Sequence, residues 1–212
     1  MSAAAGASAP AALRFARALR RAIDRAAAGM AYVAGWNYVA CALFITADIV
    51  GRSVFGVSSA ATVEISGYML ACGISWSLAH TLAERAHIRV DVLINRMPLR
   101  PRALLHLFAL LLLGLFAAFL AWAGWQLLDE SLMFDAHDNS ALHIPMALPQ
   151  GIWAFGLGAF LVMIAALVLE AALGLFCGRY DEIAALLGSR SIDDEAEEAL
   201  EAVAMARQET RA

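Results

Sequence analysis

The chain has 212 residues, of which 62% are hydrophobic and 16% charged, whereas a soluble domain is about 45–50% apolar and about 25% charged. Its apolar residues gather in four runs without Asp, Glu or Arg, each close to or above the roughly 18–20 residues that cross a bilayer as a helix. Buried helices of this length would leave too little polar surface to dissolve the chain, so the composition argues against a soluble protein. The formal net charge of −4 says little, because the charges are segregated along the chain.

The first 28 residues contain no membrane span. Residues 1–10 are a run of Ser, Ala, Gly and Pro that we expect to be disordered. In the segment "PAALRFARALRRAIDR" that follows, arginines flank a face of apolar residues, and a basic amphipathic helix of this kind lies flat among lipid headgroups. We therefore expect an interfacial arm helix that ends near residue 28, with a disordered basic arm as the alternative. Its expected anchors at the membrane surface are Arg14, Arg17, Arg20, Arg21 and Arg25.

Spans one and two are expected over about residues 29–51 and 62–83. Asp48 and Arg52 lie one helical turn apart at the end of span one, so their side chains can pair. Glu64 opens span two at the positive end of its helix dipole. We expect these three residues to form a small ionic cluster where the two spans meet.

The segment between spans two and three is basic but not uniformly polar. Its apolar residues recur at helical spacing and predict a short amphipathic segment along the inner membrane interface: Val90, Leu93, Ile94 and Met97. Pro98 and Pro101 then turn the chain into the next span. Three polar residues of this segment either bind a partner or hold the turn together: His87, Arg89 and Asp91.

Spans three and four are expected over about residues 102–127 and 149–175. Tryptophans at their outer ends are typical of an interfacial aromatic belt: Trp122, Trp125 and Trp153. The acidic loop between the spans ends in Pro145 and Pro149, which suit a bend followed by a helix start. We expect residues 179–212 to be an acidic, solvated cytoplasmic tail, with docking to a partner as the alternative.

The arginines indicate how the chain is oriented. Five precede span one and five lie between spans two and three, but one lies between spans one and two and none between spans three and four. Basic residues on short loops stay in the cytoplasm. The sequence therefore predicts an all-α membrane protein with a four-span domain over residues 29–178 and both termini inside.

The expected spans contain almost no ionisable or strongly polar residues near the middle of the bilayer. Ionisable residues within a membrane span normally mark a substrate or ion pathway, and here the acidic residues lie near span ends. His80 and His106 suggest a haem only if they face each other at matched depth. The group Asp135, His137 and Asp138 matches no tight metal-ligand motif. We therefore predict no enzyme, metal, cofactor or nucleic-acid partner.

Several motifs in order resemble a known family. They are the Asp48/Arg52 pair, the acid at Glu64, "HIRVDVL" from residue 87, a basic proline-bearing turn, and "SALHIPMALP" from residue 140. Over roughly residues 31–175 the chain is similar to the small membrane subunit of tripartite ATP-independent periplasmic (TRAP) transporters, the DctQ-type family. It departs from that pattern before Glu64, where the family often carries a tryptophan.

The resemblance implies a scaffold role in a multi-pass protein of the bacterial inner membrane. Such a subunit supports a large membrane transport subunit, which contains the substrate and ion sites, and it helps a periplasmic solute-binding protein to dock. The implied cargo is an organic acid imported by an ion gradient. The candidate assembly residues are Asp48, Arg52, Glu64, His87, Arg89, Asp91, Ser140, Pro145 and Pro149. The alternatives are an electron-transfer protein with a haem on His80 and His106, and a self-sufficient small transporter.

Overall fold

Five helices make up the computed structural model, which describes residues 10–57, 59, 61–85, 94, 97–139, 142–188, 200 and 203. They are α1 (Ala11–Phe55), α2 (Thr62–Ala83), α3 (Leu99–Met133), α4 (Ala147–Phe176) and α5 (Tyr180–Leu187). Within these ranges the only β-type pairing is an isolated bridge between His137 and Pro145. The predicted all-helical class is therefore confirmed.

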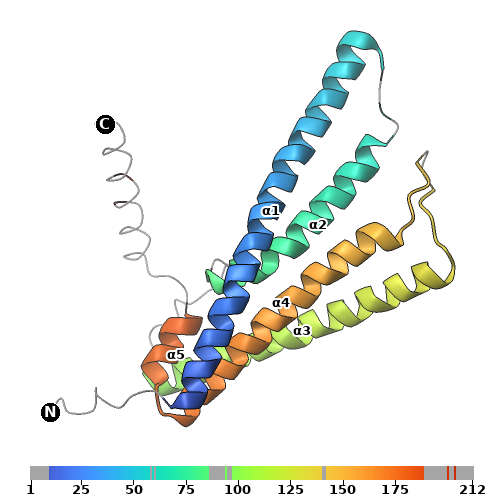
Figure 1. Ribbon diagram of the computed structural model, residues 1–212. Helices are drawn as coiled ribbons and strands as arrows, with labels where there is room; N and C mark the ends of the chain where they lie inside the picture. The colour runs from blue at the N-terminus through green and yellow to red at the C-terminus, as the bar shows by residue number, and fades with distance from the viewer. Residues whose placement is uncertain are drawn as a thin grey trace.

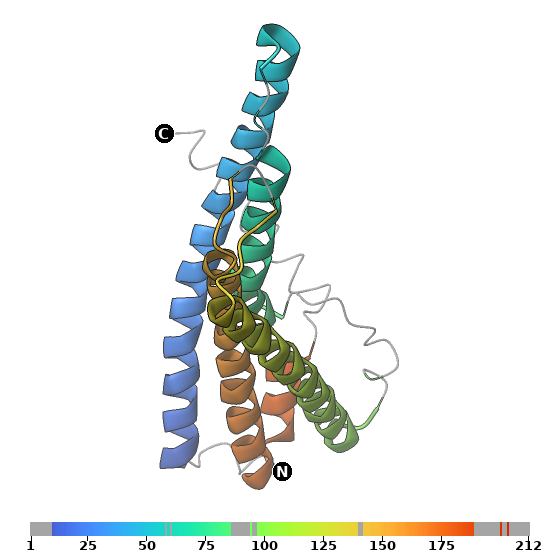
Figure 2. The same ribbon diagram turned by 90° about the vertical axis from the view of Figure 1, so that its right-hand side faces the viewer.

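The helices form two pairs, α1 with α2 and α3 with α4, which meet at one end of the molecule and diverge toward the other (Figures 1 and 2). Helix α4 is the centre of the fold, because it packs against α1, α2, α3 and α5. Its inward side chains provide much of the core: Phe160, Met163, Ile164, Leu167 and Ala171. Because lipid tails are as apolar as these side chains, close van der Waals packing holds such helices together in a membrane.

The N-terminal arm is not a separate helix. Helix α1 continues without a break from Ala11 to Phe55 and is about 65 Å long at 1.5 Å per residue. Residues 26–28 are alanines, the strongest helix formers, and nothing there interrupts the backbone hydrogen bonds. The predicted boundary near residue 28 is therefore wrong. Two residues of the face expected to touch lipid, Leu13 and Ala16, are buried instead.

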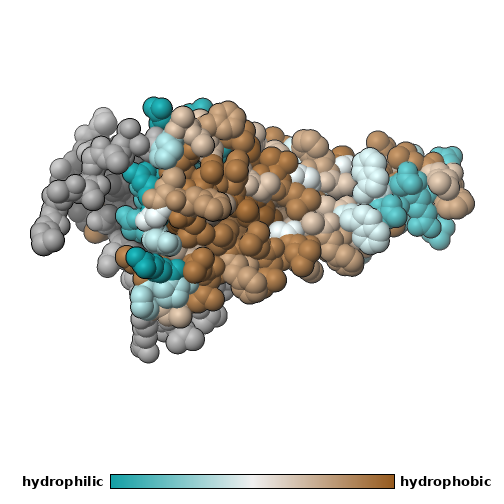
Figure 3. Space-filling view, turned by 90° about the horizontal axis from the view of Figure 1, so that it is seen from below, coloured by the Kyte–Doolittle hydropathy of each residue, from teal (hydrophilic) through white to brown (hydrophobic). Residues whose placement is uncertain are grey.

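Of the helices in the described residues, three are long and apolar enough to cross a membrane: α1, α3 and α4. The four expected spans lie within α1 to α4, but α2, which carries a glutamate, a histidine and three serines in 22 residues, does not reach the same hydropathy. One face of the molecule shows a broad hydrophobic band between hydrophilic ends (Figure 3). This pattern is that of a protein surrounded by lipid at its middle and by water at its ends.

The start of the predicted solvated tail is folded. Residues 180–187 form α5, which packs on α3 and α4 and buries Ile183, Ala184 and Leu187. Gly178, at a φ of 70° that favours glycine, makes the turn between α4 and α5. The other expected tail residues, apart from Arg179, Gly188, Leu200 and Val203, lie outside the described residues.

Candidate functional site

The arginine-rich end is the end of the bundle where α1 and α3 begin, α2 and α4 finish, and α5 lies (Figure 1). Its central group is Glu170 on α4, whose side chain is only 9% exposed. One carboxylate oxygen accepts a hydrogen bond from Arg20 Nε at 2.6 Å, and the other lies 3.5 Å from Arg17 Nε. Arg17 also pairs with Glu182 of α5. Two arginines and two glutamates thus join three helices through an alternating ionic network.

A cavity of about 850 Å³ lies beside this network. Besides the four network residues, charged side chains from α1 and from the end of α2 line it: Arg14, Arg21, Asp24, Glu84 and Arg85. Of the predicted surface anchors, Arg14, Arg21 and Arg25 are exposed, as membrane anchors would be. Arg17 and Arg20 instead form intramolecular ion pairs, so their role in the fold differs from the expected one.

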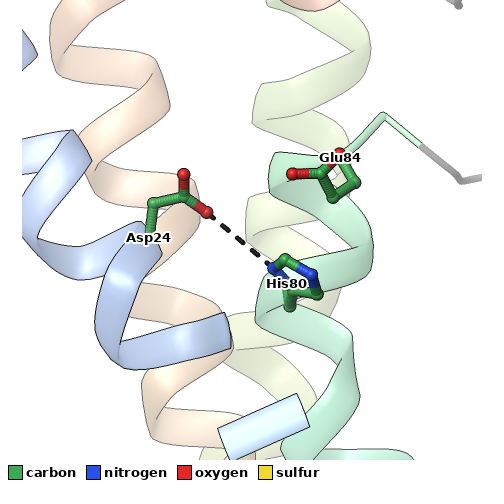
Figure 4. Close-up of side chains that lie close together, drawn as sticks. All are labelled: Asp24, His80 and Glu84. Carbon is green, nitrogen blue, oxygen red and sulfur yellow. Dashed lines mark ion pairs between the residues drawn. The ribbon is translucent and has the colours of Figure 1, made fainter. Parts of the chain in front are cut away.

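Asp24, His80 and Glu84 converge at the edge of this cavity (Figure 4). His80 lies in the last turn of α2, Glu84 is the residue just past the end of that helix, and Asp24 faces them from α1. Asp24 Oδ1 lies 3.9 Å from His80 Nδ1, too far for a hydrogen bond. Both atoms are buried and have no hydrogen-bond partner in the described structure.

At the opposite end, Asp48 and Arg52 form the expected i, i+4 pair at 3.2 Å. Asp48 also accepts a hydrogen bond from the backbone N–H of Ser59 at 2.7 Å, which ties the end of α1 to the following loop. Among the described residues Glu64 makes no ion pair with Arg52. The structure thus places Asp48 at the centre of the contacts at this end.

Removal of Asp48 should cost more stability than removal of Arg52. The Asp48 side chain is 5% exposed, whereas that of Arg52 is 62% exposed. We expect Asp48→Ala to lower the free energy of unfolding by about 1–3 kcal/mol, because the Ser59 N–H loses its acceptor, and Arg52→Ala by about 0–1 kcal/mol. Thermal unfolding in detergent measures both, and equal effects would contradict this account.

The loop between α3 and α4 folds back on itself as a short hairpin. Asp138 N–H donates to the carbonyl of Ile144, and Met146 N–H donates to that of Ala136. The Tyr68 hydroxyl of α2 donates to Asp138 Oδ2 at 2.7 Å and fastens this hairpin to the neighbouring helix pair. The sequence contained no signal for this contact, since the two residues lie far apart along the chain.

Tyr68→Phe should release the hairpin without disturbing α2. The change removes one hydrogen bond to a charged acceptor, worth about 1.5–3 kcal/mol, and keeps the ring. We expect faster hydrogen exchange at the amides of Asp138 and Met146, with exchange of the α2 amides unchanged. Tyr32→Phe on the exposed face of α1 is the matched control. Unchanged hairpin exchange in Tyr68→Phe would show that the hydroxyl does not hold the loop.

In the middle of the bundle, polar groups connect helices. Asn37 Nδ2 of α1 donates to the Met69 carbonyl of α2 at 2.6 Å. Trp76 Nε1 of α2 donates to the Ile152 carbonyl of α4 at 2.9 Å. Hydrogen bonds of this kind between helices add stability in a bilayer because the lipid offers no partner.

The remaining predicted residues lie in several places. Trp122 and Trp125 are exposed on α3, while Trp153 packs on Gly124, where an added Cβ would lie 2.6 Å from its ring. Pro149 lies in the first turn of α4, and Pro145 pairs with His137 in the hairpin. Four lie outside the described residues: His87, Arg89, Asp91 and Ser140. Of the predicted amphipathic segment between spans two and three, only Ile94 and Met97 are described.

The two histidines proposed for a haem are not brought together. His80 faces Asp24 of α1, and His106 is buried on α3. Helices α2 and α3 are not in contact in the described part of the chain.

A scan against protein-family models matches residues 41–174 to the family described as "Tripartite ATP-independent periplasmic transporters, DctQ component". The match covers more than half of the chain and includes all of α2 and α3, α1 from residue 41 onward, and α4 up to residue 174. A search of curated proteins and a search of solved structures found no match. The chain therefore belongs to the DctQ family and is the small membrane component of a tripartite ATP-independent periplasmic transporter.

Proposed function

We propose that this subunit is the scaffold of an importer of organic acids in the bacterial inner membrane, driven by an ion gradient, and that it does not bind the transported solute itself. In this proposal a large membrane subunit carries the solute, and a periplasmic binding protein delivers it. The subunit keeps the large subunit in position and contributes to the docking surface.

The main support for the proposal is that polar side chains in the middle of the bundle form hydrogen bonds between helices. The side chains of Asn37 and Trp76 each donate to a backbone carbonyl of a neighbouring helix. A solute or ion pathway needs midplane ionisable groups or broken helices. In the described residues, α1, α3 and α4 are unbroken, and their charged side chains lie toward their ends. This arrangement suits a subunit that supports a partner in the membrane and does not conduct a solute.

We further propose four spans, with α2 as the second, and the arginine-rich end in the cytoplasm. Helix α2 lies against both α1 and α4, which reduces its contact with lipid. The hydroxyls of Ser75, Ser77 and Thr81 donate to carbonyls of α2 itself, which lowers the cost of placing them in a bilayer. The arginine distribution supports the orientation.

The partners are assigned to two surfaces. Large apolar side chains on α3 remain exposed and offer an area for the large subunit or for lipid: Leu104, Phe108, Leu115, Phe116, Phe119 and Trp122. The Asp48/Arg52 pair and the hairpin held by Tyr68 lie at the other end, which we assign to the periplasm and to the binding protein. His87, Arg89, Asp91 and Ser140 remain candidate assembly residues.

Reconstitution tests the proposal. The subunit is placed in proteoliposomes alone, or with the large membrane subunit that co-purifies with it and the binding protein, and uptake of a labelled dicarboxylate is measured under a sodium gradient. We expect uptake only with all three components. Uptake by the subunit alone would overturn the scaffold role and favour the self-sufficient transporter.

The same preparation tests the electron-transfer alternative. A Soret absorption band that depends on His80 and His106 would favour that alternative over the scaffold. We expect the spectrum of the purified subunit to lack this band.

A further inference from the structure

The geometry points to a divalent transition-metal site made by Asp24, His80 and Glu84 at the arginine-rich end. Each residue offers one ligand atom, and these atoms all lie within 4.8 Å of one another (Figure 4). We propose that one ion, with Zn²⁺ as the reference, binds there and joins α1 to α2. This site adds to the proposed scaffold function and does not depend on what is transported.

The ligands come from two neighbouring helices and from the residue that ends one of them. His80 lies in the last turn of α2, and Glu84, four residues further on, is the C-cap residue just past the end of that helix. Asp24 comes from α1, which packs against α2. An ion bound by all three would therefore link α1 to the C-terminal end of α2.

Two of the ligand atoms have no hydrogen-bond partner. Asp24 Oδ1 and His80 Nδ1 are buried atoms without a partner in the described structure, although buried polar atoms are nearly always satisfied. Their separation of 3.9 Å exceeds a hydrogen bond, whereas two ligand atoms that each lie about 2.0–2.2 Å from one tetrahedral zinc ion are about 3.3–3.6 Å apart. A closer approach by a few tenths of an ångström would let a shared ion satisfy both atoms, with Glu84 within 4.8 Å as the third ligand.

Charge and access also bear on this site. Of the five arginines that line the cavity, Arg17 and Arg20 are directed to Glu170 and Glu182, and Arg21 and Arg85 donate to backbone carbonyls. With a neutral imidazole, the carboxylates of Asp24 and Glu84 balance a divalent charge. One nitrogen and two carboxylate oxygens suit zinc, manganese or cobalt better than calcium or magnesium, which prefer oxygen alone. The adjacent cavity of about 850 Å³ admits the ion and leaves room for water as further ligands.

The sequence predicts no metal, because nothing in it places Asp24 opposite His80. A helical His–Glu pair one turn apart is common by chance. Only the packing of α1 against α2 adds the third ligand.

Metal titration of the full chain in detergent tests the site. The purified protein is stripped with EDTA, dialysed, and titrated with Zn²⁺ by calorimetry and with Co²⁺ by visible absorption. We expect one ion per chain, cobalt bands without a thiolate charge-transfer band, and a higher melting temperature when Zn²⁺ is present, because the ion binds only the folded state. A thiolate band would assign the ion to an exposed cysteine, Cys177, and would overturn the proposal.

Three variants and one control locate the ion. Asp24→Asn, His80→Ala and Glu84→Gln should each weaken binding by more than about tenfold, which is within the range seen for disturbed metal sites. His143→Asn is the matched control, since His143 is an exposed histidine with a φ of 44° that asparagine tolerates. Circular dichroism shows which variants are folded, and the zinc affinity is compared only among those. Absence of saturable uptake by the wild type, or equal affinity in the folded variants, would overturn the site.

Discussion

Glu170→Gln should be the most damaging single change at the arginine-rich end. It removes the carboxylate that faces both Arg17 and Arg20, and the Glu170 side chain is 9% exposed. Breaking a buried ion pair costs about 3–5 kcal/mol. The side chains of Arg17 and Arg20 are 33% and 21% exposed, so water partly solvates their unpaired charges. We therefore expect the free energy of unfolding to fall by about 2 kcal/mol. Thermal unfolding in detergent measures it.

Glu182→Gln is the matched control for this change. Glu182 has a 40% exposed side chain and pairs with Arg17 and Arg179. We expect it to cost about 0–1 kcal/mol, as an exposed pair does. A cycle with Arg20→Gln should show a coupling to Glu170 of about 0.5–3 kcal/mol. Equal losses from Glu170→Gln and Glu182→Gln, or additive effects in the cycle, would refute the central role of Glu170.

Gly156→Ala should separate α2 from α4. A Cβ at this position would lie 2.7 Å from the backbone carbonyl carbon of Ser75 and 2.8 Å from its Cβ. Backbone cannot move aside as a side chain does, so the two helices must shift apart. Overpacking of this kind costs about 1–3 kcal/mol, and the loss should appear as lower thermal stability. The Trp76–Ile152 hydrogen bond crosses the same interface and should weaken with it.

Gly158→Ala is the control on the same helix. An added Cβ there meets nothing within 4 Å. Because alanine is a better helix former than glycine by roughly 0.5–1 kcal/mol, we expect Gly158→Ala to be neutral or stabilising. Stability changes of opposite sign at two glycines of one helix would show that the close approach of α2, and not helix propensity, determines the effect of Gly156→Ala. Similar effects at both positions would contradict this.

Several features of the fold could be predicted because their causes are local in sequence. Long uncharged runs indicate helices of membrane length wherever they occur, and the expected four spans lie within α1 to α4. Asp48 and Arg52 pair because four residues make one helical turn. Pro149 fits the first turn of α4 because its missing N–H costs nothing there.

Other features were misjudged for identifiable reasons. The arm was expected to stop near residue 28, but its amphipathic pattern shows only which face is apolar and not what covers that face. Leu13 and Ala16 are covered by protein. The segment after residue 178 was judged by the acidity of the whole tail, which hid the apolar face of Ile183, Ala184 and Leu187 that docks in α5.

The sequence by itself determined the helical class, the segregation of arginines and the motifs by which the family is found. Each depends on composition or on spacing within one segment. The tertiary structure decided which side chains meet: Glu170 with Arg17 and Arg20, Gly156 with Ser75, and Asp24 with His80. The apolar residues of α2, α3 and α4 are spread around each helix and not gathered on one face, so their sequences do not indicate which face turns inward. Only the packing of helices far apart in the chain provides that information.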